Sequence, residues 1–492
     1  MKEIKPYSSV IFIVSILLIL SPLVYFAPKE GWKIGNMHLH FLTLEEFLHP
    51  KKQEKKDITK IVADVDTASI ELDEPSDLIK HDGKSDGSLG APSGGELSTE
   101  SRTQLVLTEG AKTELIQFFQ LLDKVAEEKS KIHILHYGDS QIEGDRMTGY
   151  IRQRLQTQFG GNGPGLIPAT NVYTTQTFKQ TFSSNFMRYT CYGGEKLKNR
   201  RYGSLGSAAR FTAETYDTNL IKTFSKQEGW IEIEPHKMAY KRAKIYNNVK
   251  LFYTSCIQPC ALKIYQNGKI IHEDSLITDG KYHALPLSFA GAPGKLKYVF
   301  SSHVSPTICG FSLEGDYGVQ VDNIAMRGCS GNIFGAIDYT SFSKMNSDLN
   351  SKLVIMQFGG NAVPFFKDSS AVRRYANSLQ SHIRLVKKLN PGATIVFIGP
   401  SDMSYLSNGI YESYPLLPYC VEQLKKIAGK EKAAYWDLFA AMGGKNAMPS
   451  WVDKGLAGKD YIHFNNKGAS IASQMFYDAF EAEFARWKMK TP

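Results

Sequence analysis

Apolar runs alternate with helical patterns in two separated parts of the chain. The first part opens with Ile132–Tyr137, an apolar run typical of a buried strand, and Gly138-Asp139-Ser140 ends it. From about Asp145, apolar residues recur at helical spacing: Met147, Tyr150, Ile151 and Leu155. A strand, a sharp turn and a helix place Ser140 at the carboxyl end of the strand. Open α/β sheets hold their reactive groups at that end.

The second part has the same rhythm beyond residue 320. Strands are predicted at 321–326, 353–358, 394–398 and 434–438, and helices at 372–389, 419–428 and 467–487. A further helix is predicted at 107–128, before the Ser140 strand. Strands that alternate with helices predict an α/β fold, with a parallel sheet covered by helices on both faces.

Residues 166–325 have a different pattern. Short β-prone runs are separated by turn signals such as Asn267-Gly268 and Asp279-Gly280, which favours an all-β sandwich. The α/β domain is therefore predicted to be split into residues 105–165 and 326–492, with the sandwich inserted after its first strand–helix unit. The aromatic residues of the insert could bind sugars, although each is typical of a core as well.

The N-terminal hundred residues are predicted to lie outside these domains. Val10–Phe26 is almost wholly apolar and follows Lys2 and Lys5, so residues 1–28 are interpreted as an uncleaved membrane anchor, with a cleaved signal peptide as the alternative. Residues 29–104 are predicted to be a largely disordered tether, because 51–100 are rich in charge, Gly, Ser and Pro. This arrangement predicts a periplasmic or extracytoplasmic protein anchored to the inner membrane.

Composition narrows the function classes. The 492 residues carry a net charge of +9, but the basic residues are scattered and no nucleic-acid motif is present, so nucleic acid is not expected as a partner. The six cysteines fit an oxidising compartment, and Cys256 and Cys260 are close enough in sequence for a disulfide. No Cys or His cluster completes a metal site and no P-loop is present, so no metal or cofactor is expected.

Candidate chemistry lies at turns that follow predicted elements on one side of the sheet. These turns carry Ser140, Gly331, Asn361 and the pair Asp460 and His463. Acyl transfer by a serine requires a nucleophile, a base, an acid that orients the base and donors for the oxyanion. Asp460 and His463 are three residues apart, so one loop can present the imidazole to Ser140.

The same blocks resemble the SGNH (GDSL-like) hydrolase superfamily. They are GDS at 138–140, GCSG at 328–331, GGN at 359–361 and DxxH at 460–463, in the order of that superfamily. Within it, the stretch HYGDSQIEGDRMTGYIRQRLQTQFGGNGPGL, the long β insert and the ending WVDKGLAGKDYIHFNNKGA resemble the periplasmic peptidoglycan O-acetylesterases. Members of that group carry a carbohydrate-binding-like insert, and the superfamily has a flavodoxin-like parallel sheet.

The resemblance implies a role for each residue. Ser140 is the implied nucleophile and His463 the base, with Asp460 as its partner. The backbone N–H groups of Ser140 and Gly331 and the amide of Asn361 form the implied oxyanion hole. Gly328 is the alternative to Gly331, the third block reads GGNA where GTND is commoner, and Asp139 is interpreted as structural.

The expected function is removal of O-acetyl groups from an envelope polysaccharide through an acetyl-enzyme, and peptidoglycan is the polysaccharide that we expect first. Two alternatives remain open. An O-acetyltransferase would use the same residues, with a sugar hydroxyl in place of water. A non-catalytic glycan-binding protein would use residues 166–325 and would have no need of Ser140, Asp460 and His463.

Overall fold

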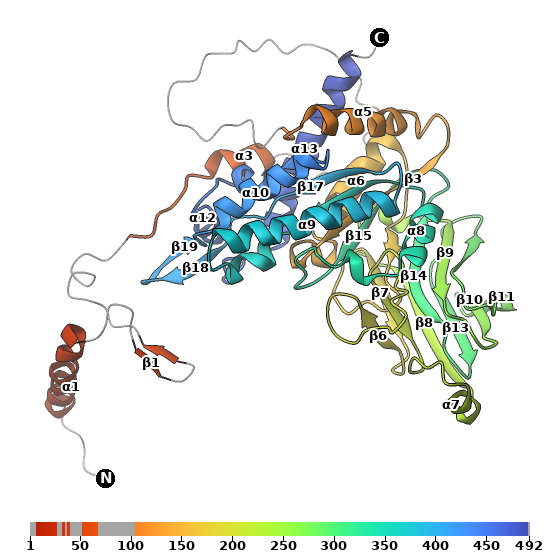
Figure 1. Cartoon of the computed structure of the whole chain (residues 1–492), viewed down its shortest axis with the longest axis horizontal. Helices are drawn as coiled ribbons and strands as arrows, with labels where there is room; N and C mark the ends of the chain where they lie inside the picture. The colour runs from red at the N-terminus through yellow and green to blue at the C-terminus, as the bar shows by residue number, and fades with distance from the viewer. Residues whose placement is uncertain (1–5, 27–31, 35–36, 40–51, 67–103, 491–492) are drawn as a thin grey trace.

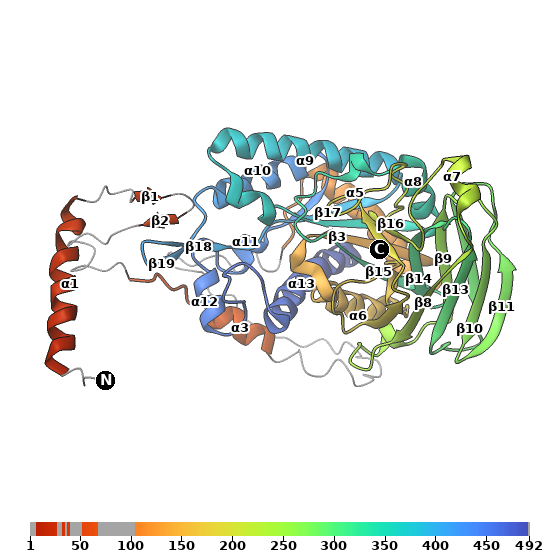
Figure 2. The same cartoon turned by 90° about the horizontal axis from the view of Figure 1, so that it is seen from below.

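The chain consists of an α/β part and a β part that lie side by side (Figure 1). The computed structural model describes residues 6–26, 32–34, 37–39, 52–66 and 104–490. The strands of the β part gather at one end of the molecule, and the long helices surround the sheet of the α/β part (Figures 1 and 2).

Five parallel strands form the sheet of the α/β part. They are β3 (Lys131–Gly138), β15 (Gly318–Ala325), β16 (Ser351–Gln357), β17 (Thr394–Ile398) and β20 (Ala434–Trp436). Their spatial order is β15-β3-β16-β17-β20, and each neighbouring pair is parallel. Counted along this part of the chain the order is 2-1-3-4-5, the flavodoxin-like order that the resemblance implies. All five strands therefore present their carboxyl ends at one edge of the sheet.

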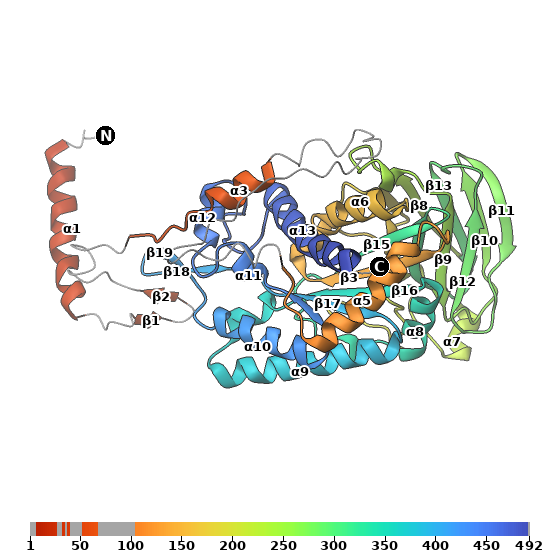
Figure 3. The same ribbon diagram turned by 90° about the horizontal axis from the view of Figure 1, so that it is seen from above.

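Helices cover both faces of this sheet, because neighbouring strand residues point to opposite sides. Ile134 joins the core beneath α5 (Glu109–Lys124), α6 (Thr148–Phe159) and α13 (Asn466–Lys490), and Leu135 joins the core beneath α8 (Tyr339–Asp348), α9 (Ser369–Leu389) and α10 (Leu417–Lys430). Figure 3 shows α9 and α10 on one side of the strands and α6 and α13 on the other. The predicted helices and strands of this part are confirmed.

The β part consists of two antiparallel sheets that share one core. One sheet contains β5 (Phe178–Phe182), β8 (Gln227–Pro235), β10 (Ala261–Gln266), β11 (Lys269–Ser275) and β13 (Leu296–Ser302). The other contains β4 (Gly165–Ile167), β6 (Met187–Thr190), β7 (Ser207–Arg210), β9 (Asn248–Thr254), β12 (His283–Ser288) and β14 (Thr307–Glu314). Side chains of both sheets, including Ile231, Leu251 and Tyr298, pack in this core.

Short elements complete the described chain. They are α7 (Thr218–Thr223), α11 (Leu438–Ala441), α12 (Met448–Asp453), the hairpin β18 (Ser404–Ser407) and β19 (Ile410–Ser413), and the 3₁₀ turns η2 (Arg242–Lys244) and η3 (Phe334–Ala336). The predicted end of the insert at residue 325 lies one strand too late. β15 pairs with β3 in the parallel sheet, so the insert ends before Gly318.

The predicted tether, residues 29–104, is wrong over 52–66. There α3 (Thr59–Asp66) packs against α13, and Ile58 and Ile61 are buried in the core of the α/β part. Lys56 N–H also donates to Ser450 Oγ at 2.8 Å. Residues 67–103, the rest of the low-complexity stretch, lie outside the described residues.

The predicted membrane anchor at residues 1–28 is not confirmed. Its described part is α1 (Pro6–Phe26), which lies apart from the domains and is followed by the hairpin β1 (Trp32–Ile34) and β2 (Met37–Leu39) (Figure 1). Within the described residues, no helix meets the length and hydropathy that a membrane span requires.

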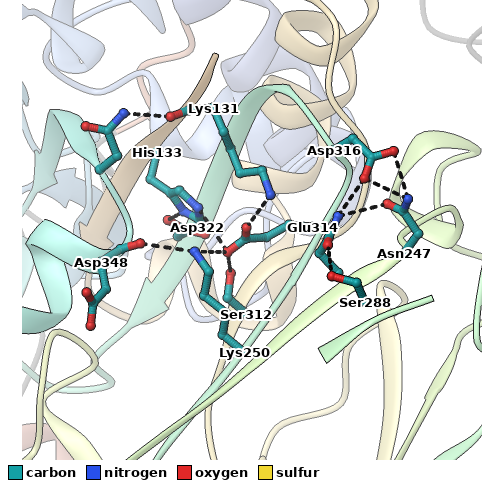
Figure 4. A network of polar contacts seen from close by, with 12 residues as sticks. Lys131, His133, Asn247, Lys250, Ser288, Ser312, Glu314, Asp316, Asp322 and Asp348 are labelled. Carbon is teal, nitrogen blue, oxygen red and sulfur yellow. Dashed lines mark hydrogen bonds and ion pairs between the residues drawn. The ribbon is translucent and has the colours of Figure 1, made fainter. Parts of the chain in front are cut away.

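A buried cluster of charged side chains joins the two parts. His133 on β3 places Nδ1 2.7 Å from Asp322 Oδ2 on β15 and Nε2 3.3 Å from Glu314 Oε1 on β14 (Figure 4). Lys131 and Lys250 reach the same Glu314 carboxylate, at 2.8 and 3.5 Å. His133, Glu314 and Asp322 have no solvent exposure, so each depends on the others for neutralisation.

Two histidines on β3 titrate in opposite directions. Burial alone would lower the pKa of His133, but Asp322 and Glu314 raise it to about 9. His136 is equally buried without an acidic partner, and desolvation lowers its pKa to about 4. At neutral pH the strand therefore holds one charged and one neutral imidazole.

We predict that the free energy of unfolding falls as pH rises from 6.5 to 9. His133 keeps its proton up to about pH 9 when folded but only to about 6.5 when unfolded, so its stabilisation is full below 6.5 and is lost toward 9. The fall should amount to about 3 kcal/mol. Urea titrations at several pH values measure it. His133→Gln should abolish the slope, and His136→Gln should keep it; an unchanged slope in His133→Gln would contradict the account.

Candidate active site

Ser140 stands at the carboxyl end of β3, as predicted. It opens the 3₁₀ turn η1 (Ser140–Asp145), immediately after β3 and Asp139. Asp139 caps this turn, because its Oδ1 accepts the Gln141 N–H at 2.9 Å. Gly144 has φ +69°, and a side chain there would meet the Thr174 carbonyl, so this sharp turn requires glycine.

The structure brings Ser140, His463 and Asp460 together in one line. Ser140 Oγ lies 2.8 Å from His463 Nε2, and His463 Nδ1 lies 2.8 Å from Asp460 Oδ2. Asp460 Oδ1 also accepts the backbone N–H groups of Ile462 and His463, at 3.0 and 3.1 Å. Partial burial raises the pKa of Asp460, but the hydrogen bonds from His463 and from the two backbone groups lower it overall. The carboxylate therefore stays ionised and orients the imidazole.

Asn361 lies beside this line but its amide is already engaged. It belongs to η4 (Gly360–Phe365), which follows β16. Its Nδ2 donates to Asp139 Oδ2 at 3.0 Å and to the Cys329 carbonyl at 3.3 Å. Burial raises the pKa of Asp139 to about 6, against the hydrogen bonds from Gln141 and Asn361. Asp139 therefore links the Ser140 turn to Asn361, in keeping with its predicted structural role.

The two candidate glycines occupy different positions. Gly328 lines the groove described below, together with Ser140, Asn361 and His463. Gly331 is packed against Phe358, and its N–H donates to Cys329 Sγ at 3.3 Å. Sulfur is a weak acceptor, so this N–H makes only a weak hydrogen bond. The choice of Gly331 over Gly328 stays a prediction.

Two clefts meet at Ser140, Asn361 and His463. The first, called the groove, has a volume of about 1310 Å³ and is lined by polar and aromatic side chains, among them Arg146 and Arg327 from the α/β part and Tyr173 and Tyr240 from the β part. The second, called the apolar pocket, has about 150 Å³ and is lined by Phe358, Pro364, Phe365, Met403 and Ile462. Ser140 and His463 therefore border both a wide space of mixed polar and apolar lining and a small, mainly apolar one.

Several residues of this site carried no signal in the sequence. Tyr173 lies on the far wall of the groove, with the guanidinium groups of Arg327 and Arg188 at 4.8 and 5.9 Å from its ring. Arg327 also pairs with Glu143 of the Ser140 turn. These residues come from three distant segments, and nothing in residue type or spacing distinguishes them. The GDSQIEGDR stretch did contain Gln141 and Arg146, whose contacts with the His463 loop are described below.

The cysteines take no part in the reactive line. All six lie in the described residues, and all are buried and free, so the disulfide considered for Cys256 and Cys260 is absent there. Burial raises the pKa of the Cys329 thiol to about 12, which leaves it protonated and unreactive. Within the described part of the chain, no three His, Cys, Asp or Glu side chains are grouped as metal ligands.

Comparisons with known proteins find one family model and several solved structures that resemble this chain. Residues 288–471 match the GDSL-like Lipase/Acylhydrolase family. A search of curated proteins finds no match. A solved structure described as a peptidoglycan O-acetylesterase in action is 19% identical, with a TM-score of 0.59, and the match covers 75% of this chain and 96% of that one.

Two other solved structures match with lower scores. A family 2 carbohydrate esterase with a carbohydrate-binding domain, from Corynascus (Myceliophthora fergusii), is 13% identical over 53% of this chain and 96% of that one, with a TM-score of 0.25. A family 2 carbohydrate esterase from Clostridium thermocellum, in complex with cellohexaose, is 12% identical over 54% and 93%, with a TM-score of 0.21. The family match confirms the resemblance to the SGNH hydrolases and the interpretation of the chain as a serine hydrolase of that type.

We predict that Ser140→Ala lowers kcat for 4-nitrophenyl acetate by about 10⁴-fold or more, because the nucleophile is lost. Asp460→Asn should lower kcat by roughly 10²–10⁴-fold, since the imidazole loses its orienting partner. Steady-state kinetics measure both. Ser184→Ala, at an exposed serine of the β part, serves as the control and should match the wild type. Full activity in folded Ser140→Ala would exclude this site.

Proposed function

We propose that this chain, a hydrolase of the SGNH type, removes O-acetyl groups from an envelope polysaccharide, with peptidoglycan as the preferred substrate. One observation carries the proposal: Ser140 and His463, which are joined by a hydrogen bond, line both a wide groove with many polar side chains and a small apolar pocket. An acetylated sugar has the matching division, with a large polar alcohol on one side of the ester and a small apolar acyl group on the other.

The apolar pocket suits a short acyl group. Its volume is about 150 Å³, and a methyl group needs about as much space as one water molecule, roughly 30 Å³. Phe358, Pro364 and Ile462 would surround the acetyl methyl with carbon atoms. Asn361 lies between the two clefts, where its amide could turn from Asp139 toward the ester oxygen.

The groove suits a glycan chain. It is open, wide and lined by side chains that donate hydrogen bonds or offer an aromatic face, which are the groups that hold sugars in clefts. One wall comes from the β part, through Tyr173, Met238 and Tyr240. The β part therefore acts in this proposal as a wall of the catalytic site.

The reaction would proceed in two steps. In the first, Ser140 Oγ attacks the acetyl carbonyl while His463 Nε2 takes the hydroxyl proton, and the sugar oxygen leaves with that proton. In the second, a water molecule gives a proton to His463 Nε2 and attacks the acetyl-enzyme carbonyl. The bond to Ser140 Oγ then breaks, His463 returns the proton to Ser140 Oγ, and acetate leaves. Asp460 stabilises the imidazolium in both steps, and the backbone N–H groups of Ser140 and Gly331 and the Asn361 amide would hold the oxyanion.

Peptidoglycan is preferred because the solved structure with a TM-score of 0.59 is a peptidoglycan O-acetylesterase. That polymer lies outside the cytoplasm, so the same proposal includes a periplasmic location. The N-terminal membrane anchor stays a prediction from the apolar sequence of residues 10–26.

The first experiment measures acetate release from O-acetylated peptidoglycan by the full chain, beside Ser140→Ala. We expect release by the wild type and none by the variant. Release of acetate from acetylated xylan but not from peptidoglycan would support the esterase activity and contradict peptidoglycan as the substrate. Transfer of acetyl to added oligosaccharide in place of release would favour the O-acetyltransferase, and sugar binding without any Ser140-dependent chemistry would favour the binding protein.

We also predict that Tyr173→Ala weakens activity on acetylated polymer but not on the small ester 4-nitrophenyl acetate. Loss of the aromatic wall should raise KM for acetylated polymer by roughly tenfold, since a stacked aromatic ring contributes on the order of 1 kcal/mol. The kcat/KM for 4-nitrophenyl acetate should change less than threefold. Tyr265→Ala, on β10 of the same part and outside the groove, is the matched control. Equal losses on both substrates in Tyr173→Ala would contradict a role in polymer binding.

A further inference from the structure

The loop that carries the proposed base has little regular structure of its own. Residues 458–463 belong to no helix or strand, although Ala457 and Phe464 form an isolated bridge across the base of the loop. Asp460 is exposed and His463 is half-buried. The position of the imidazole relative to Ser140 must therefore be set by contacts between this loop and its surroundings.

Gln141, the residue after the proposed nucleophile, forms hydrogen bonds with the loop on both sides of His463. Its Nε2 donates to the Ile462 carbonyl at 2.7 Å, and its Oε1 accepts the Phe464 N–H at 3.3 Å. These are the two bonds that a neighbouring strand would make with this stretch. Nε2 also donates to Ser401 Oγ at 3.2 Å, and the side chain is buried. Both the nitrogen and the oxygen of the amide are thus hydrogen-bonded, which fixes the side chain.

Arg146, at the end of the same turn, makes a second connection. Its guanidinium donates to the Phe464 carbonyl at 2.9 Å, to the Glu143 carbonyl at 2.9 Å and to the Ser140 carbonyl. One rigid planar group therefore joins the nucleophile's own backbone to the residue that follows the base. The planar fork suits such a bridge, which the single ammonium of lysine could not reproduce.

The opposite side of the loop rests on the β18–β19 hairpin. Tyr461 stacks on Tyr411 with ring centroids 3.4 Å apart, and the Tyr461 carbonyl accepts the Ser404 N–H at 2.9 Å. These contacts fix the loop to the hairpin but do not connect it to the Ser140 turn. Gln141 and Arg146 make that connection, so they control the distance between Ser140 Oγ and His463 Nε2.

We propose that Gln141 and Arg146 are positioning residues, which hold the His463 loop against the Ser140 turn and so set the hydrogen bond through which the serine loses its proton. This role rests on the proposed function, since it concerns the same reaction. In this role both side chains act on the loop, although Arg146 also lines the groove and Gln141 the apolar pocket. Misplacement of a reacting group by about 1 Å can cost roughly 10²-fold in rate, so the two side chains should matter mostly for kcat.

Gln141→Glu gives the sharpest test, because it keeps shape and changes one proton. An ionised carboxylate cannot donate to the Ile462 carbonyl and would repel it, whereas a protonated carboxyl can donate to Ile462 and still accept from Phe464. Burial favours the protonated form on acidification. Asp139 and His463 line the same pocket as Gln141. Burial raises the pKa of Asp139 to about 6 in the wild type too, so the ratio of variant to wild type removes the contribution of groups that both proteins share.

We expect kcat for 4-nitrophenyl acetate in Gln141→Glu to be about 10²-fold below wild type at pH 8. The ratio should recover to within about tenfold at pH 5.5, as the carboxyl regains its donor. Gln141→Ala should show the loss without the recovery. Gln117→Glu, at an exposed residue of α5, should stay near a ratio of one at both pH values. A ratio that does not depend on pH in Gln141→Glu, or a Gln141→Ala variant within threefold of wild type, would overturn the proposal.

A second measurement tests the positioning role independently of the proposed esterase activity. The proton on His463 Nδ1, shared with Asp460, should give a low-field NMR signal in the wild type. Gln141→Ala and Arg146→Lys should broaden or remove it while circular dichroism stays unchanged. An intact signal in both variants would overturn the positioning role. If the wild type hydrolyses no ester at all, the proposed function fails, and the NMR arm still decides the role of the two side chains.

Discussion

The hydrogen bond between Ser140 Oγ and His463 Nε2 is the contact on which the proposed chemistry depends, and it joins residues 323 positions apart. Neither partner can be placed by local structure alone. Ser140 owes its position to β3, the strand next to the middle of the sheet's order, whose residues 132–138 are all buried. His463 owes its position to a loop that is held from outside. The His463 loop must therefore be held against the rigid Ser140 turn, and side chains of that turn are suitably placed to hold it.

Sequence predicted the α/β part well because that part obeys local rules. Short apolar runs such as Ile132–Tyr137 and Thr394–Ile398, each followed by turn residues, favour buried strands, and a parallel sheet then places those turns at one edge. For this reason the residue pattern by itself leads to the expectation that Ser140, Asn361 and the Asp460–His463 loop lie near one another. The order of the strands came from the family resemblance, and the pairing of β15 with β3 supports it.

The errors arose where tertiary contacts override composition. Residues 52–66 have the charge content of a tether, but Ile58 and Ile61 find a core to enter, and a short amphipathic helix is stable once packed. The predicted insert ended at residue 325 and so overlapped the α/β strand predicted at 321–326, which corresponds to β15 of the parallel sheet. The walls of the groove could not be predicted at all, since Tyr173, Arg327 and Arg146 meet through the folding of two different domains.

The buried cluster at the junction explains how a domain inserted at one edge of the sheet reaches the other. The insert begins at the amino edge, where the Val319 N–H donates to the Gly160 carbonyl at 3.0 Å. It then runs beside β15: Leu166 N–H donates to Asp322 Oδ1 at 2.6 Å, and Tyr173 finally stacks beneath Arg327 beyond the strand's end.

Asp322 thus uses one oxygen to hold β4 and the other to hold His133, which in turn faces Glu314 on β14. A charge buried this deeply is costly unless every partner is in place, so the cluster tolerates one register between the two domains and few others. That register carries the aromatic wall to the carboxyl edge, opposite Ser140. The segment that Asp322 holds at Leu166 thus continues to Tyr173, which lines the groove beside Ser140.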